Sequence, residues 1–352
     1  MNENNLLNYK NDVNKSINEY LENKAKEAHG FYSDVGIIFD ELRNFAIRGG
    51  KRLRAIFIIV GYMLGNKEVN SDIISIASTI EHFQNWMLIH DDIIDNGLVR
   101  RNGDTLHIAL AKRFNEYAEK FPNLAANIAI VVGDVIESYI IDLLTKSGAD
   151  NNTKIKFLKE YGRMEEYTAM GQILDILLSA KPLSEVSEDD VIKIIQYKTS
   201  YYTIAIPLKM GAILSGMDEA NTKALESFGI NVGIAFQILD DLFGAGYYTN
   251  EQTDKFANDL IEGKKTLLAL RALSKSDNDD HEFLKKAYSL PTRDMETAKK
   301  IKNIFDKYDI QNEMESLITN YNNMALKSIE SFSKEQKELL KKVIEMSTKR
   351  KY

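Results

Sequence analysis

Apolar residues recur every three or four positions along most of the chain. Near the start this spacing joins Val13 and Ile17, and near the end it joins Ile301, Ile304 and Tyr308. Such a period places the apolar side chains on one face of an α-helix, whereas the alternation typical of strands is scarce. The pattern therefore predicts a chain built almost entirely from helices.

Breaker-rich stretches separate these helical segments. The chain has only four prolines and 19 glycines, which favours long uninterrupted helices. Ser187 followed by three acidic residues is typical of a helix start. The expected loops are residues 65–72, 97–105, 147–153, 180–187 and 274–280. We expect one all-α domain over residues 1–352. Segments 73–94 and 123–145 are apolar on most faces, which predicts a place at the centre of a helical bundle.

Two aspartate clusters follow apolar helical segments. The first is residues 91–95 (DDIID), in which Asp91 and Asp95 share one helix face. The second is Asp240 with Asp241. One such pair could be a solvated helix end, but two pairs placed directly after apolar runs favour a cation site. Carboxylates in this setting suit Mg²⁺, which completes its shell with water and substrate phosphates.

Basic motifs surround these clusters. Residues 49–54 (GGKRLR) open an apolar helix, so that free N–H groups, a positive helix end and three cationic side chains coincide. Arg100 and Arg101 follow the first cluster, and Lys198-Thr199 and residues 263–266 (GKKT) provide further cations. An ordinary basic turn is the alternative for each motif taken alone. Together with the aspartates they predict a phosphate-bearing substrate.

Composition excludes several classes of protein. The net charge is −7, which argues against a general nucleic-acid binder. Cysteine is absent, so disulfides and thiolate metal sites are excluded. The N-terminal residues show no secretory signal, and the apolar run 55–64 is too short to span a bilayer. We expect a soluble cytoplasmic protein without a membrane span.

In order along the chain, these motifs resemble those of the trans-isoprenyl diphosphate synthase (polyprenyl synthetase) family. The resemblance covers about residues 40 to 270, with helical continuation to the end. Its motifs are residues 49–54 (GGKRLR), 81–82 (EH), 88–95 (LIHDDIID), 100–107 (RRNGDTLH), 133–134 (GD), 171–175 (GQILD), 198–199 (KT), 236–241 (FQILDD) and 258–266 (NDLIEGKKT).

Three departures from the family pattern stand out. Asn102 and Asp104 alter the segment after the first cluster, where the family has proline at the position of Asp104. Gly244 replaces the third aspartate of the second cluster, so that only two carboxylates are expected there. The usual Gly-Lys-Pro reads Asp-Lys-Phe around Lys255. The Gly244 variant resembles geranylgeranyl diphosphate synthases more than bacterial farnesyl enzymes, and the whole pattern is most similar to archaeal-type geranylgeranyl diphosphate synthases.

The resemblance implies a bundle of antiparallel helices around a deep central cavity, usually in a homodimer, and it assigns roles to single residues. The implied Mg²⁺ ligands are Asp91, Asp95, Asp240 and Asp241, with three ions expected. The residues implied to hold the allylic diphosphate are Arg100, Lys198, Gln237, Lys255 and Lys264. The residues implied to bind isopentenyl diphosphate are Lys51, Arg54, His82 and Arg101. Thr199 and Gln172 would stabilise the allylic cation through their dipoles.

Bulky residues before the first cluster are expected to limit product length. Trp86 and Met87 lie five and four positions before Asp91, and Phe83 lies about one turn earlier. The resemblance makes them the floor of the cavity, although core packing is the alternative. The expected reaction joins isopentenyl diphosphate head-to-tail to a C5, C10 or C15 allylic diphosphate and favours a C20 product. The alternatives are C15 or C25 products, a terpene cyclase, a regulatory subunit and a helical scaffold.

Overall fold

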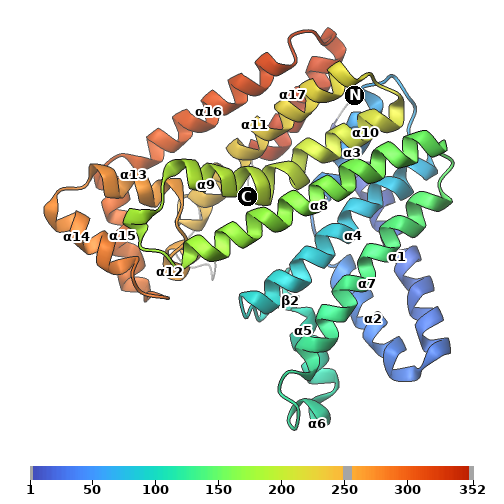
Figure 1. The fold of residues 1–352 in the computed structure, drawn as a ribbon, viewed down its shortest axis with the longest axis horizontal. Helices are drawn as coiled ribbons and strands as arrows, with labels where there is room; N and C mark the ends of the chain where they lie inside the picture. The colour runs from blue at the N-terminus through green and yellow to red at the C-terminus, as the bar shows by residue number, and fades with distance from the viewer. Residues whose placement is uncertain (1–2, 249–255, 349–352) are drawn as a thin grey trace. The chain divides into compact units, whose positions relative to one another are not determined.

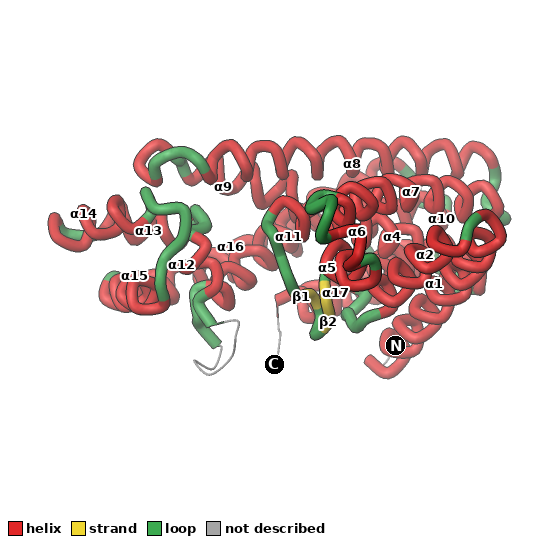
Figure 2. The backbone as a smooth tube through the Cα atoms, turned by 90° about the horizontal axis from the view of Figure 1, so that it is seen from below, coloured by secondary structure: helices red, strands yellow, loops and turns green. Residues whose placement is uncertain are grey.

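The computed structural model describes residues 3–248 and 256–348, and they are almost entirely helical. The predicted all-α fold is confirmed. Figure 2 shows that the described tube is helix and loop apart from one short hairpin. By contacts the chain divides into two compact units, Met1–Phe157 with Gly211–Gly216, and Leu158–Met210 with Met217–Tyr352. The expectation of one domain over residues 1–352 stays a prediction.

The first unit contains the N-terminal helices, the hairpin and the ends of two longer helices. Its complete elements are α1 (Glu3–Phe31), α2 (Ser33–Ile47), α3 (Leu53–Met63), α4 (Ser71–Ile94), β1 (Val99–Arg100), β2 (Gly103–Asp104), α5 (Leu106–Arg113), α6 (Asn115–Ala118) and α7 (Leu124–Lys146). It also holds the start of α8 (Asn151–Ser179) and the end of α10 (Ile206–Ser215).

Helix α4 forms the core of this unit because nearly every face of it is covered. It packs against α1, α3 and α7, and Figure 1 shows it alongside α7. Ile76, Ala77 and Phe83 are fully buried, and burying a side chain the size of isoleucine or phenylalanine contributes about 1.5–3 kcal/mol. Asn70 caps its start by accepting a hydrogen bond from the N–H of Ile73 at 3.0 Å.

The central position expected for residues 123–145 is wrong for one face of α7. Ile130, Val131 and Ile141 are 41%, 62% and 46% exposed, although α7 packs against α4, α5 and α6 elsewhere. Among the described residues α7 is also the one helix long and apolar enough to cross a membrane, and 39% of its most apolar window is buried. A core helix of a globular protein passes the same test.

The predicted loops overlap the breaks between helices, but residues 151–153 belong to α8, and most of the predicted loop 274–280 lies in the helices Leu267–Lys275 and Asn278–Ala287. The segment 97–105 forms a hairpin in which Val99 pairs with Asp104 and Arg100 with Gly103. Arg101 and Asn102 at its tip have φ of 51° and 59°. Two consecutive positive φ angles define the tight turn whose twist matches that of paired strands, and asparagine tolerates this conformation.

The second unit contains most of α8 and the helices that follow it. These are η1 (Leu183–Glu185), α9 (Glu188–Ile194), η2 (Ile195–Ala205), the start of α10, α11 (Glu219–Gly244), α12 (Asn258–Glu262), α13 (Leu267–Lys275), α14 (Asn278–Ala287), α15 (Met295–Lys307), α16 (Ile310–Ser328) and α17 (Lys334–Thr348). Its core includes Ile238 and Leu242 of α11 together with Leu268 and Phe305. The helix start expected at Ser187 is confirmed by a reciprocal pair of bonds with Asp190.

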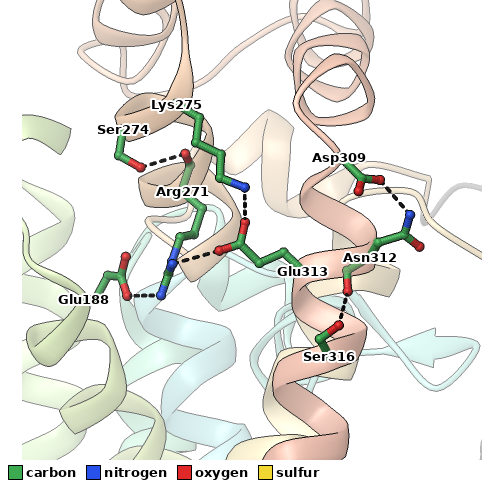
Figure 3. Close-up of polar contacts among 8 residues, drawn as sticks. All are labelled: Glu188, Arg271, Ser274, Lys275, Asp309, Asn312, Glu313 and Ser316. Atoms are coloured by element: carbon green, nitrogen blue, oxygen red, sulfur yellow. Dashed lines mark hydrogen bonds and ion pairs between the residues drawn. The ribbon is translucent and has the colours of Figure 1, made fainter.

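Polar contacts fix the elements of this unit at their ends. Arg271 on α13 donates to Glu188 at the start of α9 and to Glu313 on α16, each at 2.7 Å (Figure 3). Lys275 adds a second contact to Glu313 at 2.5 Å. Arg271 is 32% exposed on its side chain, and partly exposed pairs of this kind contribute roughly 1 kcal/mol or less. They orient the helices more than they stabilise the fold.

Candidate active site

In the first unit, Asp91 and Asp95 lie on one face of α4 at its C-terminal end. Asp95 is the residue that caps the helix, and its N–H donates to the carbonyl of Asp91 at 2.8 Å. Asp91 is half-buried and Asp95 is exposed. Two carboxylates one turn apart at a helix end, where the helix dipole is also negative, repel each other and attract a cation.

Between them Asp92 points elsewhere and binds Arg100. Asp92 is 2% exposed and accepts hydrogen bonds from Nε of Arg100 at 2.7 and 2.9 Å. A further contact from the same guanidinium is 2.5 Å long. Breaking a buried pair leaves an unpaired charge, so this contact fixes Arg100 beside the acidic face. Arg100 is thus a predicted substrate contact whose orientation depends on Asp92, a residue for which no role is predicted.

The basic loop before α3 brings several guanidinium groups together. Arg52 is buried and structural, with bonds to Asn14 at 2.7 Å and to the carbonyl of Ala46 at 2.8 Å. Arg101 donates to the carbonyl of Arg48 at 3.2 Å. Burial, followed by the charge of Arg52, lowers the pKa of Arg101 to about 10. Crowding of cationic groups in this way favours a bound anion.

Of the other residues predicted to bind isopentenyl diphosphate, Lys51 is exposed and Arg54 is half-buried at the start of α3. The charge of Arg54 is among those acting on Arg101, so these two residues lie in one basic cluster. The structure therefore brings part of the predicted set together in the first unit.

The predicted contact of His82 with substrate stays a prediction, and its buried Nε2 has no hydrogen-bond partner among the described residues. It is 1% exposed, and its ring lies 5.5 Å from that of Tyr20 and 6.1 Å from that of Tyr139. Burial, followed by the charge of Arg52, lowers its pKa to about 3, so the ring is neutral. At about 100° per residue, His82 points about 160° away from the Asp91–Asp95 face of α4.

Gln84 lies on the same face of α4 as Asp91 and Asp95. The same helical period aligns Gln84 with the middle of the Asp91–Asp95 face. Gln84 is 6% exposed, and its Oε1 has no hydrogen-bond partner among the described residues. A buried amide oxygen without a partner is costly and calls for a water or ligand. The sequence signal for Gln84 was its register with Asp91, which was overlooked.

The residues expected to limit product length precede the first aspartate cluster on α4. Phe83 is fully buried, and the ring of Trp86 lies 5.8 Å from it and 6.1 Å from the ring of His90. A Cβ on Gly133 of α7 would lie 3.2 Å from Trp86. Trp86 and Met87 are both half-buried. Trp86 therefore packs toward α7, and glycine at position 133 leaves room for its ring.

A small pocket of about 80 Å³ lies within the second unit. Its wall residues are Asp175, Val191, Ile194, Ile195, Lys198, Thr199, Gln237, Asp241, Lys264, Lys265 and Thr266. Five of the residues selected from the sequence thus meet here, namely Lys198, Thr199, Gln237, Asp241 and Lys264. Gln172 is half-buried on α8 and is not among the wall residues. Lys255 lies outside the described residues.

Lys198 and Thr199 belong to η2, which is a π-helix. Wide helical turns of this kind are frequent at functional sites. Gly171 of α8 permits the close approach of η2, since a Cβ there would lie 2.3 Å from the backbone nitrogen of Lys198. Lys198 then contacts Asp175 at 2.5 Å.

A chain of hydrogen bonds connects η2 to α11. Thr199 donates to Oε1 of Gln237 at 3.0 Å, and Nε2 of Gln237 donates to Asp241 at 2.8 Å. Asp241 is 4% exposed, and burial raises its pKa to about 7. Asp240, the neighbouring residue, is half-buried.

Lys264 carries the positive charge of this pocket. Burial opposes its charge, but Asp259, Asp241, Asp240 and Asp175 outweigh that effect and raise the pKa of Lys264. Its Nζ lies 3.5 Å from Oδ1 of Asp259. The lysine is therefore held as a cation among carboxylates.

The absence of a side chain at Gly244 leaves room for a carboxylate from another helix, which the sequence did not reveal. A Cβ at this position would lie 2.0 Å from Oδ2 and 2.3 Å from Cγ of Asp259. The carboxylate of Asp259 on α12 therefore fills the space beside Gly244. The second cluster has a third carboxylate after all, and it comes from a different helix. Asp259 and Asp175 were missed as site residues because their positions depend on packing.

The donor set suits a hard divalent cation. Carboxylate oxygens are available in both units, and within the described residues no group of three or more acidic or imidazole side chains could hold a metal by itself. Mg²⁺ needs few protein ligands because it keeps waters and binds substrate phosphates. The residues present fit Mg²⁺ that arrives with a diphosphate.

Comparison with known proteins decides the family. The sequence matches the polyprenyl synthetase family over residues 37–307. The chain belongs to this family. The predicted family and enzyme class, a prenyltransferase, are thereby confirmed, and the matched range contains every residue selected from the sequence.

Among polyprenyl synthetases, several relatives cover most of the chain. A geranylgeranyl diphosphate synthase of Saccharolobus solfataricus is 26% identical over 91% of this chain and 90% of its own. A geranylgeranyl pyrophosphate synthase of Geoglobus acetivorans is 30% identical over 74% of this chain and 73% of its own. Other relatives are named geranylfarnesyl and farnesyl synthases.

Solved structures of similar proteins agree with this family assignment. One is a geranylgeranyl pyrophosphate synthase from Corynebacterium glutamicum, complexed with isoprenyl diphosphate and magnesium. It is 25% identical and aligns with a TM-score of 0.86 over 97% of this chain and 99% of that one.

Proposed function

We propose that this polyprenyl synthetase is a Mg²⁺-dependent short-chain trans-prenyltransferase that condenses isopentenyl diphosphate with allylic diphosphates to a C20 product. The observation that carries the proposal is the family match over residues 37–307, which contains both aspartate clusters. The relatives named geranylgeranyl synthases support C20. Farnesyl and geranylfarnesyl products are the alternatives.

In the proposed site, the acidic residues bind metal. We propose Asp91, Asp95, Asp240 and Asp241 as the Mg²⁺ ligands. We propose three Mg²⁺ ions per site, and Mg²⁺ supplies Lewis-acid stabilisation of the departing diphosphate when bound. The magnesium in the related Corynebacterium glutamicum structure supports the choice of metal.

The basic residues would orient the two substrates. We assign the allylic diphosphate to Arg100, Lys198, Gln237, Lys264 and Lys255. We assign isopentenyl diphosphate to Lys51, Arg54 and Arg101, with Gln84 in place of His82. The contact of Lys198 with Asp175 at 2.5 Å keeps that lysine in one orientation until a diphosphate competes for it.

The reaction would begin when the C–O bond of the allylic diphosphate breaks and leaves an allylic cation. The double bond of isopentenyl diphosphate attacks this cation, and a proton is then lost to a base, for which the released diphosphate is one candidate. Thr199 and Gln172 would face the cation with oxygen dipoles. Thr199 donates to Gln237, so its oxygen lone pairs stay available. Apolar walls would exclude the water that converts the cation to an alcohol.

We also propose that the protein forms a homodimer and is cytoplasmic. The exposed apolar residues Ile130, Val131 and Ile141 on α7 support a partner surface, since an exposed apolar face of this kind favours association. Sedimentation of the wild type and of V131E would test it, with a shift to monomer expected for the variant. The absence of cysteine suits a reducing compartment.

Labelled isopentenyl diphosphate tests the activity directly. The protein is incubated with this substrate and with each of the C5, C10 and C15 allylic diphosphates, with and without a chelator. We expect label in a C20 product and loss of turnover on chelation, with recovery on added Mg²⁺. If the label never enters a longer prenyl chain, the synthase assignment fails. Label in a cyclic hydrocarbon would indicate a cyclase instead.

A further inference from the structure

Lys264 stands on a short turn between α12 and α13. Gly263 has φ of 74°, and the N–H of Lys264 donates to the carbonyl of Asp259 at 2.9 Å. Because the turn sets where the lysine side chain begins, the residues that support the turn also limit where Nζ can lie. Because Lys264 lies among carboxylates, its position matters for any diphosphate that binds there.

Arg293 holds this turn in place through hydrogen bonds to backbone carbonyls. It lies between α14 and α15, is 7% exposed and occurs in none of the motifs that predict the site. Its Nε donates to the carbonyl of Ala287 at 2.8 Å and its Nη2 to that of Leu290 at 2.9 Å. Its backbone N–H and Nη1 both reach the carbonyl of Ile261, at 2.9 and 3.5 Å.

The guanidinium of Arg293 thus joins the C-terminal ends of two helices. The carbonyls of Ala287 and Ile261 belong to the last turns of α14 and α12, whose carbonyls have no partners within their own helices. A cation at such an end is also favoured by the helix dipole. The ring of Tyr288 lies 5.0 Å from the guanidinium carbon.

Contact with Gly263 transmits this arrangement to the turn. A Cβ at Gly263 would lie 1.6 Å from Nη1 of Arg293 and 2.1 Å from its Cζ. The backbone immediately before Lys264 therefore lies directly against the guanidinium. Lysine could not replace it, because one ammonium group cannot reach carbonyls in three directions as the planar fork of arginine does.

We propose that Arg293 is a positioning residue that acts through Lys264 in binding the allylic diphosphate. The inference rests on the proposed function, in which Lys264 holds that diphosphate. If Arg293 acts only through Lys264, its replacement should matter when Lys264 is present and not when it is absent.

A double-mutant cycle tests this with R293K, K264A and the double variant. Two quantities are measured, the KM for the allylic diphosphate and the affinity for inorganic pyrophosphate with Mg²⁺ by calorimetry. We expect R293K to raise KM and weaken pyrophosphate binding about tenfold, with kcat within about threefold. In the K264A background R293K should change either quantity less than about twofold.

The control is R271K, in the same unit. Arg271 binds Glu188 and Glu313 and makes no hydrogen bond or ion pair with residues 259–266 among its described contacts (Figure 3). It should change KM less than twofold in either background. If R293K does not fold, G263A disturbs the same contact from the side of the turn and should show the same dependence on Lys264.

Two results would overturn the proposal. One is an equal effect of R293K in both backgrounds, which would mean that Arg293 acts on the fold in general. The other is a folded R293K protein with unchanged KM and pyrophosphate affinity. A wild type that binds pyrophosphate but transfers no prenyl group would contradict the proposed function, and the pyrophosphate arm would still decide the role of Arg293.

Discussion

Replacing Gln84 and His82 by alanine should separate two residues that lie two positions apart on α4. Gln84 shares a face with Asp91 and Asp95, and His82 lies about 160° away, between Tyr20 and Tyr139. We expect Q84A to raise the KM for isopentenyl diphosphate and H82A to leave it unchanged. Both side chains are buried, so burial alone does not distinguish them.

The two substitutions should change different quantities, because Gln84 is proposed to bind substrate and His82 packs in the core. A hydrogen bond to a charged group contributes about 1.5–3 kcal/mol, which corresponds to a KM increase of roughly 10- to 150-fold for Q84A. His82 packs against two aromatic rings, and truncating a large core side chain costs about 2–4 kcal/mol of unfolding free energy. H82A should therefore lower Tm while the KM stays within about twofold.

Steady-state kinetics at saturating allylic diphosphate and thermal unfolding of the same samples give both quantities. Each variant is the control for the other, since they share helix and truncation. The reasoning is refuted if folded H82A loses affinity for isopentenyl diphosphate more than Q84A does, or if Q84A binds it as the wild type does.

Three further predictions follow from single contacts. W86A should lengthen the products, because the ring against α7 is the bulky group before the first cluster; unchanged chain lengths on chromatography would exclude Trp86 as the floor. G244A should displace Asp259, whose Oδ2 lies 2.0 Å from the new Cβ, and weaken Mg²⁺-pyrophosphate binding about tenfold in calorimetry, whereas a neutral effect would mean that Asp259 is dispensable. The third concerns pH. The pKa of His82 falls to about 3 in the fold, so the unfolded chain binds the extra proton below about pH 6.5, and stability present above that pH is lost as the pH falls, by roughly 2 kcal/mol at pH 5. Urea unfolding of H82Q, which cannot take up this proton, should show a shallower decline between pH 7 and pH 5, and an identical slope would contradict the assignment.

Features that depend on residues close together in the chain could be predicted from the sequence. The period of apolar residues follows from the geometry of a single helix, and the capping of α9 at Ser187 depends on residues three positions apart. Asp91 and Asp95 share a face for the same reason. The order of the motifs gave the family, and five of the selected residues do meet in the pocket of the second unit.

Packing between distant segments decided the rest. Asp259 fills the space beside Gly244 because α12 returns to the end of α11, and Arg293 reaches the turn of Lys264 from a loop beyond α14. Which face of α7 stays exposed depends on which helices pack against it. The sequence by itself determined the helices and the aspartate face of α4, because those depend on residues a turn apart. Only the tertiary structure decided which buried polar side chains support the site, since that depends on contacts between residues far apart in the chain.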